Sequence, residues 1–554
     1  MENSINEIPK ANRTHQQPKT TTNKVINPSF TRITAHTGIN MKPDTILVLD
    51  FGGQYSHLIA RRTRENSVYS EIVSPDVTPT EIEEWQKQVN VKGLILSGGP
   101  QSVFEPNTPQ INPNILNLNL PILGLCYGHQ LIAHITGGRV KLADKKEFGI
   151  AYATIDKPIG VLEGLKKREK VWMSHSDTVY NLPNEYETLA HTENCPIAAF
   201  HHKNQPIYGL QWHPEVIHTE NGGKMLKNFL FQVCRCRPNW TMEDFIEKAV
   251  EETRKTVTER RVIVALSGGI DSSTATAIAA KAIGKNLTAV FVDHGFMRKK
   301  EPEFVENTFK QFHMNFIAVD ARQRFLKRLQ GIIDPEQKRK IIGEEFVRVF
   351  EEEAKKVGAE CLLQGTIYPD RIESGFRKFS DKIKTHHNVA GLPTKMGFKA
   401  VVEPLRNLYK DEVRKVAKKL GLPDIIVRRQ PFPGPGLAVR IVGEVTENKL
   451  NILRDADKIV TDEIESAGLK DGLWQYFAVL TDTKSTGVKG DARAYGYMIA
   501  VRIVESREAM TASFAQIPYT ILEKISSRIT NEIPEVTRVV YDITHKPPAT
   551  IEWE

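Results

Sequence analysis

Cysteine is scarce in this sequence of 554 residues, which contains five, an odd number. A disulfide framework is therefore excluded as the main support of the fold, and a reducing compartment, the cytoplasm, is expected. Long apolar runs are also missing. No stretch reaches the roughly 18 uninterrupted apolar residues that suit a membrane-spanning helix. The sequence therefore predicts a protein that does not associate with membranes.

A strong excess of one charge sign is absent as well. The formal net charge is +8, with 40% hydrophobic and 26% charged residues, which is close to an ordinary globular composition. A mildly basic balance allows nucleic acid as a partner, but it suits an enzyme that binds phosphates equally well. At roughly 100–200 residues per domain, the length predicts about three to five domains.

The first 40 residues lack apolar periodicity and contain Phe30 as their one Phe, Tyr or Trp, against seven Thr and six Asn. No apolar segment suits a signal peptide, and two early glutamates count against a transit peptide. We predict that residues 1–42 form a disordered extension. A start of translation at Met41 stays open. The first 40 residues carry +3 of the net charge, since they have five basic and two acidic residues, so +5 remains for the other 514 residues.

Beyond residue 42, apolar strand-like runs ending in glycine turns recur, with helical stretches between them. This pattern predicts an α/β fold with a largely parallel sheet for a first domain, residues 43–237. Its four runs are TILVLDFGG (45–53), GLILSGGP (93–100), PILGLCYGHQ (121–130) and YGLQWHPE (208–215).

A boundary follows near Pro238, where Thr241 is placed to cap a charged helix. A second α/β domain with a parallel sheet is predicted for residues 238–435, opening on RRVIVALSGGIDSS. After the Pro/Gly-rich QPFPGPG (430–436) the texture changes to mixed strands and helices. A C-terminal α+β domain is therefore predicted for residues 436–554, beginning with a strand at AVRIVGEV (438–445).

The first candidate site is a cysteine nucleophile in GLCYGHQ. Cys126 stands at a strand-to-helix turn between two glycines, a setting that lifts a side chain above the sheet. Backbone N–H groups of Tyr127 and of Gly99, in SGGP, could stabilise an oxyanion there. His213 in QWHPE is the natural base for the thiol, and Glu215 could fix its tautomer. Cys195, Cys234 and Cys361 have no such setting and are expected to be structural or exposed.

GLCYGHQ, with SGGP before it and QWHPE after it, resembles the class I glutamine amidotransferases. The resemblance implies that Cys126 forms a thioester with the glutamine amide carbon. It also implies that His213 moves the proton while Glu215 orients His213.

The second candidate site is a phosphate-binding loop in RVIVALSGGIDSS. Glycines let several backbone N–H groups converge, serine hydroxyls add donors, and a helix begins directly afterwards. The lysine of a Walker loop is missing, because no GKS or GKT occurs. A loop of this kind suits release of pyrophosphate after attack on the α-phosphate.

SGGIDS resembles the signature of the N-type ATP pyrophosphatases, which adenylate a substrate. The resemblance implies Mg²⁺ with the ATP, held by Asp271 and Asp370, and no tightly bound organic cofactor. Lys384 is expected to stabilise charge on the α-phosphate. The residues implied in ATP binding are Ser267, Gly268, Gly269, Ile270, Asp271, Ser272, Ser273, Val292, Gly365 and Lys384.

The C-terminal segments STGVKGDARAY (485–495), RVVYDIT (538–544) and KPPATIEWE (546–554) resemble the GMP synthetase family. That family aminates xanthosine monophosphate (XMP) through an adenylate, using ammonia from glutamine, and yields GMP, AMP, pyrophosphate and glutamate. The resemblance implies glutamine, ATP and XMP as substrates and a homodimer formed by the C-terminal domain. The implied XMP-binding residues are Arg339, Gln475, Lys546, Ile551 and Glu552.

Two alternatives stay open from the sequence. One is another glutamine-dependent adenylating amidotransferase, such as an NAD or asparagine synthetase, although these pair SGGxDS loops with glutaminases that lack the GLCYGHQ and QWHPE motifs. The other is a nucleic-acid-binding protein built on an inactive enzyme fold, which predicts loss of Cys126, His213 or the SGG loop. All three are intact, so no nucleic-acid partner is expected.

Overall fold

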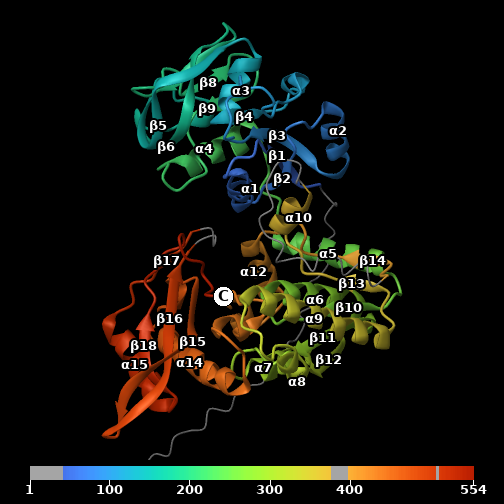
Figure 1. Cartoon of the computed structure of the whole chain (residues 1–554). Helices are drawn as coiled ribbons and strands as arrows, with labels where there is room; N and C mark the ends of the chain where they lie inside the picture. The colour runs from blue at the N-terminus through green and yellow to red at the C-terminus, as the bar shows by residue number, and fades with distance from the viewer. Residues whose placement is uncertain (1–41, 376–396, 507–510) are drawn as a thin grey trace, which may run out of the picture. The chain divides into compact units, whose positions relative to one another are not determined.

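The computed structural model describes residues 42–375, 397–506 and 511–554 (Figure 1). The predicted extension, residues 1–42, lies outside the described residues except for its last residue. Within the described ranges the strands form sheets of nine, five and four strands. No described helix is long and apolar enough to cross a membrane.

The nine-stranded sheet has the order β2-β1-β3-β4-β9-β8-β7-β5-β6 and is parallel from β2 to β9, then antiparallel. The parallel strands are β1 (Asp44–Leu49), β2 (Tyr69–Val73), β3 (Asn90–Leu96), β4 (Ile122–Leu125) and β9 (Ile207–Leu210). The antiparallel strands are β5 (Arg139–Ile155), β6 (Arg168–Asn181), β7 (Tyr186–His191) and β8 (Ala199–His202). The helices are α1 (Ser56–Glu65), α2 (Pro79–Gln88), α3 (Tyr127–Ile135) and α4 (Gly222–Lys227), with short turns at Pro113–Asn117, Gly160–Leu162 and Asn228–Val233.

The predicted α/β class is confirmed for this sheet, and its parallel half carries all four sequence motifs. Every residue of β1, β2 and β4 is buried, because helices cover both faces of the parallel strands. The antiparallel half was not predicted. Its long strands β5 and β6 leave many side chains exposed, Phe148 and Tyr152 among them, so no continuous apolar run marked them in the sequence.

The five-stranded sheet is parallel throughout, as predicted. Its strand order is β12-β11-β10-β13-β14. Its strands are β10 (Val262–Ala265), β11 (Leu287–Asp293), β12 (Asn315–Asp320), β13 (Cys361–Leu363) and β14 (Ala400–Val402). Its helices are α5 (Met242–Val257), α6 (Ile270–Ile283), α7 (Glu301–Phe309), α8 (Arg322–Arg328), α9 (Pro335–Val357), α10 (Tyr368–Gly375), α12 (Lys410–Lys419) and α13 (Asp424–Val427). The capping role of Thr241 is confirmed, since its side chain accepts a hydrogen bond from the Asp244 N–H at the start of α5.

The third sheet is the mixed α+β unit that the sequence predicts. Strands β15 and β16 form a long antiparallel hairpin, and β18 pairs with β16 in parallel. Its strands are β15 (Gln475–Lys489), β16 (Ala492–Glu505), β17 (Ser513–Phe514) and β18 (Val536–Tyr541), and its helices are α14 (Glu447–Ser466) and α15 (Tyr519–Glu532).

The strand predicted at AVRIVGEV is wrong. Residues Gly436–Arg440 form a 3-10 helix, and only Ile441 makes an isolated bridge, to Leu480. Every side chain from Leu437 to Ile441 is fully buried. A continuous apolar run of this length does not distinguish a buried strand from another buried conformation, and tertiary packing decided the outcome here.

Gly128, in α3, tests how tightly the first domain is packed. A methyl group at Gly128 would overlap the Leu96 carbonyl oxygen, whereas one at Gly223, in α4, would meet no atom within 4 Å. We expect Gly128→Ala to destabilise the domain by about 1–3 kcal/mol through overpacking. Gly223→Ala should be neutral or stabilising by up to about 1 kcal/mol. Thermal unfolding checks both, and equal melting temperatures would contradict the packing described.

Candidate active sites

Cys126 lies between the end of β4 and the first residue of α3, with φ +52° and ψ −101°. This backbone conformation is rare for a residue with a side chain and persists only where neighbouring contacts impose it. Here the chain turns back so closely that a Cβ at Gly124 would lie 2.5 Å from the Gly128 carbonyl oxygen. The thiol is buried, and its Sγ donates to the Ser174 carbonyl at 3.5 Å.

His213 and Glu215 follow β9 and form a buried pair in which Nδ1 lies 2.7 Å from Oε1 of the carboxylate. A carboxylate accepts this bond, so Nδ1 carries the proton and Nε2 stays available. A Cβ at Gly98 would lie 3.0 Å from His213 Cε1 and 3.7 Å from Cys126 Cβ, which places both side chains against the same glycine. The structure therefore brings the three predicted residues together.

The charges around His213 favour its protonated form. Burial lowers the pKa of His213, but the Glu215 carboxylate and the Cys126 sulfur together raise it by more than burial lowers it. The pKa of His213 therefore stands well above its usual value. A ring that holds a proton next to a thiol suits a thiolate–imidazolium pair, the reactive form of a cysteine nucleophile.

The two predicted oxyanion residues lie next to each other. A Cβ at Gly99 would be 3.3 Å from Cγ of Tyr127, whose residue begins α3 directly after Cys126. The Tyr127 ring is fixed by its hydroxyl, which donates to the Pro109 carbonyl at 2.7 Å. Gly99 therefore lies against the residue that directly follows Cys126.

The loop after β10 leads directly into α6, with Gly269 as the N-cap. Gly268 adopts φ +71°, a conformation that favours glycine, and the hydroxyls of Ser267 and Ser272 lie 3.0 Å apart. Gly365 comes against this loop from β13, because a Cβ there would lie 3.0 Å from Ser272 N. The predicted loop residues thus gather at one helix N-terminus.

The remaining residues predicted for this site are placed differently. The Ser273 side chain is fully buried within α6, and Val292 packs its side chain into the hydrophobic core, so only their backbones could face a nucleotide. Asp370 accepts a hydrogen bond from the Ile367 N–H at 3.2 Å near the start of α10. Asp271 pairs with Lys410 through one oxygen. Lys384 lies outside the described residues.

All five residues predicted to bind XMP belong to the C-terminal segment, residues 546–554, or form hydrogen bonds with it. Gln475 donates to Glu552 at 3.0 Å. Arg339 donates to the Glu554 carbonyl, and the Ile551 carbonyl accepts from Arg502 at 2.8 Å. Lys546 exchanges backbone hydrogen bonds with Ala512, next to β17.

Comparison with known proteins decides the family. The family "Glutamine amidotransferase class-I" matches residues 47–233, "PP-loop domain" matches 241–423 and "GMP synthase C terminal domain" matches 462–553. The GMP synthase [glutamine-hydrolyzing] of Caldicellulosiruptor saccharolyticus is 55% identical over 518 residues, which span 93% of this chain and 100% of that protein. The chain belongs to the glutamine-hydrolysing GMP synthase family. The proteins of the same name from Acetivibrio thermocellus and Finegoldia magna are 52% and 51% identical, each over 93% of this chain and their own full length.

The sequence alone did not predict a cluster of buried arginines in this member of the GMP synthase family. Arg298, Arg429 and Arg440 all lie over the Phe432 ring, at 5.1, 5.6 and 5.2 Å from its centroid. Arg429 also donates to the Gly268 carbonyl of the phosphate loop at 2.7 Å. Burial, with the nearby Arg298, lowers the pKa of Arg429 to about 10. Each of the three arginines also pairs with a carboxylate, so the cluster is a network of ion pairs: Arg298 and Arg440 with Asp457, Arg429 with Glu301, and Arg440 with Glu552.

A signal for this cluster was present but incomplete. The segment VRRQPFPGPG contains Arg429 and Phe432, and its Pro/Gly content was noted as a domain boundary. Arg298 comes from a loop more than a hundred residues earlier, and only the fold brings it to the same ring.

Glu215 can be tested as the residue that sets the charge of His213. In Glu215→Gln the hydrogen bond geometry is kept, but the raising effect of the carboxylate is lost while burial still acts. We expect the His213 titration to move to lower pH, measured by NMR with labelled histidine. Glutamine-dependent turnover should fall by about 10²–10⁴-fold.

The exposed Glu220, five residues on, provides the matched control, and Glu220→Gln should change neither quantity. Ammonia-dependent synthesis should be unaffected in both variants. An unchanged titration of His213 in Glu215→Gln would contradict the assignment.

Proposed function

We propose that Cys126, His213 and Glu215 catalyse the glutaminase step of GMP synthesis, and that the loop from Ser267 to Ser272 serves the adenylation of XMP. Membership of the GMP synthase family and the three domains in one chain support the overall reaction. The single observation that carries the residue roles is the buried Cys–His–Glu arrangement at the edge of the parallel sheet.

In the glutaminase step, the Cys126 thiolate attacks the amide carbon of glutamine. The backbone N–H groups of Tyr127 and Gly99 stabilise the oxyanion that forms. His213 gives its Nε2 proton to the leaving nitrogen, the C–N bond breaks, and ammonia departs from a thioester. His213 then takes a proton from water, which attacks the thioester and releases glutamate. Glu215 keeps the ring in the tautomer that both steps need.

In the adenylation step, the oxygen at C2 of XMP attacks the α-phosphate of ATP, and pyrophosphate leaves. The loop N–H groups, the Ser267 and Ser272 hydroxyls and the positive end of α6 hold the β- and γ-phosphates. Ammonia then attacks C2, and AMP leaves with the former oxygen. Arg429, attached to the loop at Gly268, adds positive charge beside the departing pyrophosphate.

Magnesium enters this proposal with the nucleotide. The carboxylates of Asp271 and Asp370 are the hard oxygen ligands that Mg²⁺ prefers. One oxygen of Asp271, Oδ1, is buried and has no hydrogen-bond partner among the described residues, which fits a ligand atom. The ion would neutralise charge on the phosphates.

We expect the reaction to take place in the cytoplasm. All five cysteines are buried and unpaired, and the nucleophile Cys126 works only as a free thiol. A reducing compartment keeps it in that state.

Exposed apolar side chains support a homodimer formed by the C-terminal domain. Val488, Tyr495 and Tyr519 are 75%, 71% and 89% exposed, on the β15–β16 hairpin and at the start of α15. Single exposed apolar residues are common, but three large ones in a small domain suit an interface between copies. Sedimentation should give twice the 62.6 kDa chain mass, and Val488→Asp with Tyr495→Asp should lower it. A monomeric wild type would contradict the proposal.

The overall activity is tested by mixing the protein with XMP, Mg-ATP and glutamine and assaying GMP and AMP. Cys126→Ala should abolish glutamine-dependent synthesis, because no thioester can form, and retain synthesis from added ammonium. GMP absent with every nitrogen source in the wild type would refute the function.

Asp271→Asn is the complementary variant. It should abolish GMP formation from glutamine and from ammonium, while the basal hydrolysis of glutamine remains. Loss of both activities in Cys126→Ala would contradict separate catalytic centres.

A further inference from the structure

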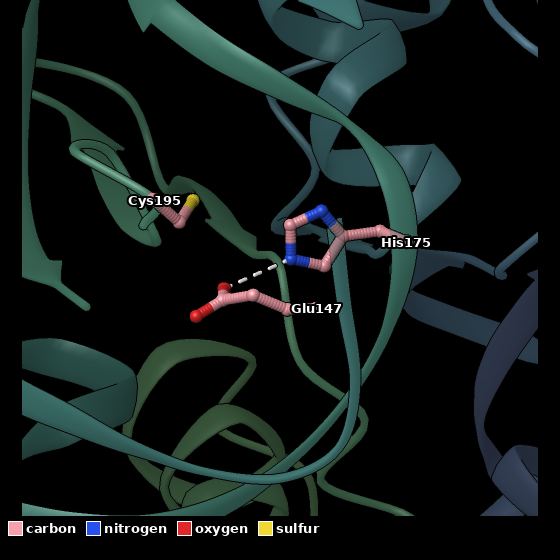
Figure 2. Close-up of side chains that lie close together, drawn as sticks. All are labelled: Glu147, His175 and Cys195. Atoms are coloured by element: carbon pink, nitrogen blue, oxygen red, sulfur yellow. Dashed lines mark hydrogen bonds and ion pairs between the residues drawn. The ribbon is translucent and has the colours of Figure 1, made fainter. Parts of the chain in front are cut away.

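A second cluster of metal-ligating side chains lies in the glutaminase domain, apart from the catalytic triad. Glu147 from β5, His175 from β6 and Cys195 from the connection between β7 and β8 point toward one another (Figure 2). Their ligand atoms all lie within 4.8 Å of one another, and all three side chains are buried. Register pairing of Glu147 with His175 across β5 and β6 fixes two of the three.

The hydrogen bonding of His175 aims its Nε2 at Glu147. Nδ1 lies 2.8 Å from the Asp177 carbonyl oxygen, which can only accept, so Nδ1 carries a hydrogen and donates it. Nε2 lies 3.2 Å from Glu147 Oε2, a separation that either a shared hydrogen atom or a metal ion between the two atoms would bridge.

Each potential ligand is also held by a further polar group. Thr192 Oγ1 donates to Glu147 Oε1 at 2.9 Å, and Thr178 Oγ1 donates to Cys195 Sγ at 3.1 Å. The Asp177 carbonyl plays the same part for His175. Metal-binding residues are characteristically oriented in this way by hydrogen bonds from their outer side.

The donor set and its spacing favour zinc. In a tetrahedral site with bonds of about 2.0–2.3 Å, ligand atoms stand about 3.3–3.7 Å apart. The 3.2 Å between His175 Nε2 and Glu147 Oε2 is already close to this range. A small rotation of the Cys195 side chain would bring its sulfur into the same range. Sulfur, imidazole nitrogen and carboxylate oxygen together select a borderline divalent ion.

An approach from solvent exists. A surface pocket of about 590 Å³ is lined by Glu147, Thr192 and Met173 among others, so an ion and a coordinating water could enter beside the carboxylate. We propose that Glu147, His175 and Cys195 bind a divalent ion of the zinc type, with water as the fourth ligand. Such an ion would fix β6 at the nucleophile, because Ser174, next to His175, accepts the hydrogen bond of the Cys126 thiol.

The test uses the full chain carrying Cys126→Ala, so that the catalytic Cys–His pair cannot bind the metal. After loading with Zn²⁺ or Co²⁺ and desalting, we expect one metal per chain by mass spectrometry of the elements. The cobalt form should show a thiolate-to-cobalt charge-transfer band.

Four additional substitutions, one of them a control, locate the ion. Cys195→Ser should remove the charge-transfer band and weaken metal binding by at least about 100-fold, whereas Cys361→Ser, at a buried cysteine of another domain, should change neither. Glu147→Gln keeps its size and most of its hydrogen bonds, so it retains the fold and should still lose affinity. Thr192→Val should cost about 10–100-fold, as for other outer hydrogen-bond partners.

Two outcomes would overturn the proposal. No metal retained by the parent chain would mean that the cluster is a buried hydrogen-bond network and not a metal site. Equal metal retention by Cys195→Ser and Glu147→Gln would place the ion elsewhere.

Discussion

Both candidate sites depend on one packing constraint: at each of them a strand end lies so close to a helix N-terminus that a Cβ on the strand residue would overlap the helix in the first domain and press tightly against it in the second. In the first domain, Gly124 approaches the Gly128 carbonyl, and this contact holds Cys126 in its left-handed conformation. In the second domain, Gly365 approaches the first turn of α6 at the backbone of Ser272, in the loop proposed to bind phosphates. Backbone N–H groups at such helix starts are unpaired within the helix, so the same constraint supplies the donors that we propose for an oxyanion in one site and for phosphates in the other.

Charged side chains are buried near these sites, and the free-energy cost of removing them from water is offset only where each charge meets a hydrogen-bonding partner. Arg440, fully buried, is held by the Glu552 carboxylate at 2.9 and 2.8 Å, and Arg502 donates to the carbonyls of Ile551 and Thr550. The last residues of the chain are therefore part of the site's structure. A buried ion pair contributes little to the net stability of a fold, whereas loss of one partner is expensive. The arginines are thus more easily explained by the anionic ligands of the reaction than by stability.

Much of the architecture followed from local patterns. Strand runs ending in glycine turns predicted the parallel sheets, and the spacing of Thr241 from Asp244 predicted a helix start that the structure confirms. The antiparallel strands β5 and β6 were not predicted, because their apolar and polar residues do not form a continuous run. The segment AVRIVGEV was wrongly predicted as a strand, because a fully buried segment has apolar residues in succession in either conformation.

The candidate sites show the same division. The sequence by itself determined the family-type motifs, which contain Cys126 and His213, and the glycine-rich loop before α6, because each motif is a local run of residues. Only the tertiary structure decided that Arg298 joins Arg429 over the Phe432 ring, and that Cys195 faces a histidine and a glutamate. These residues lie on separate elements, and their distance in space is set by strand pairing and core packing, which no single segment of the sequence encodes.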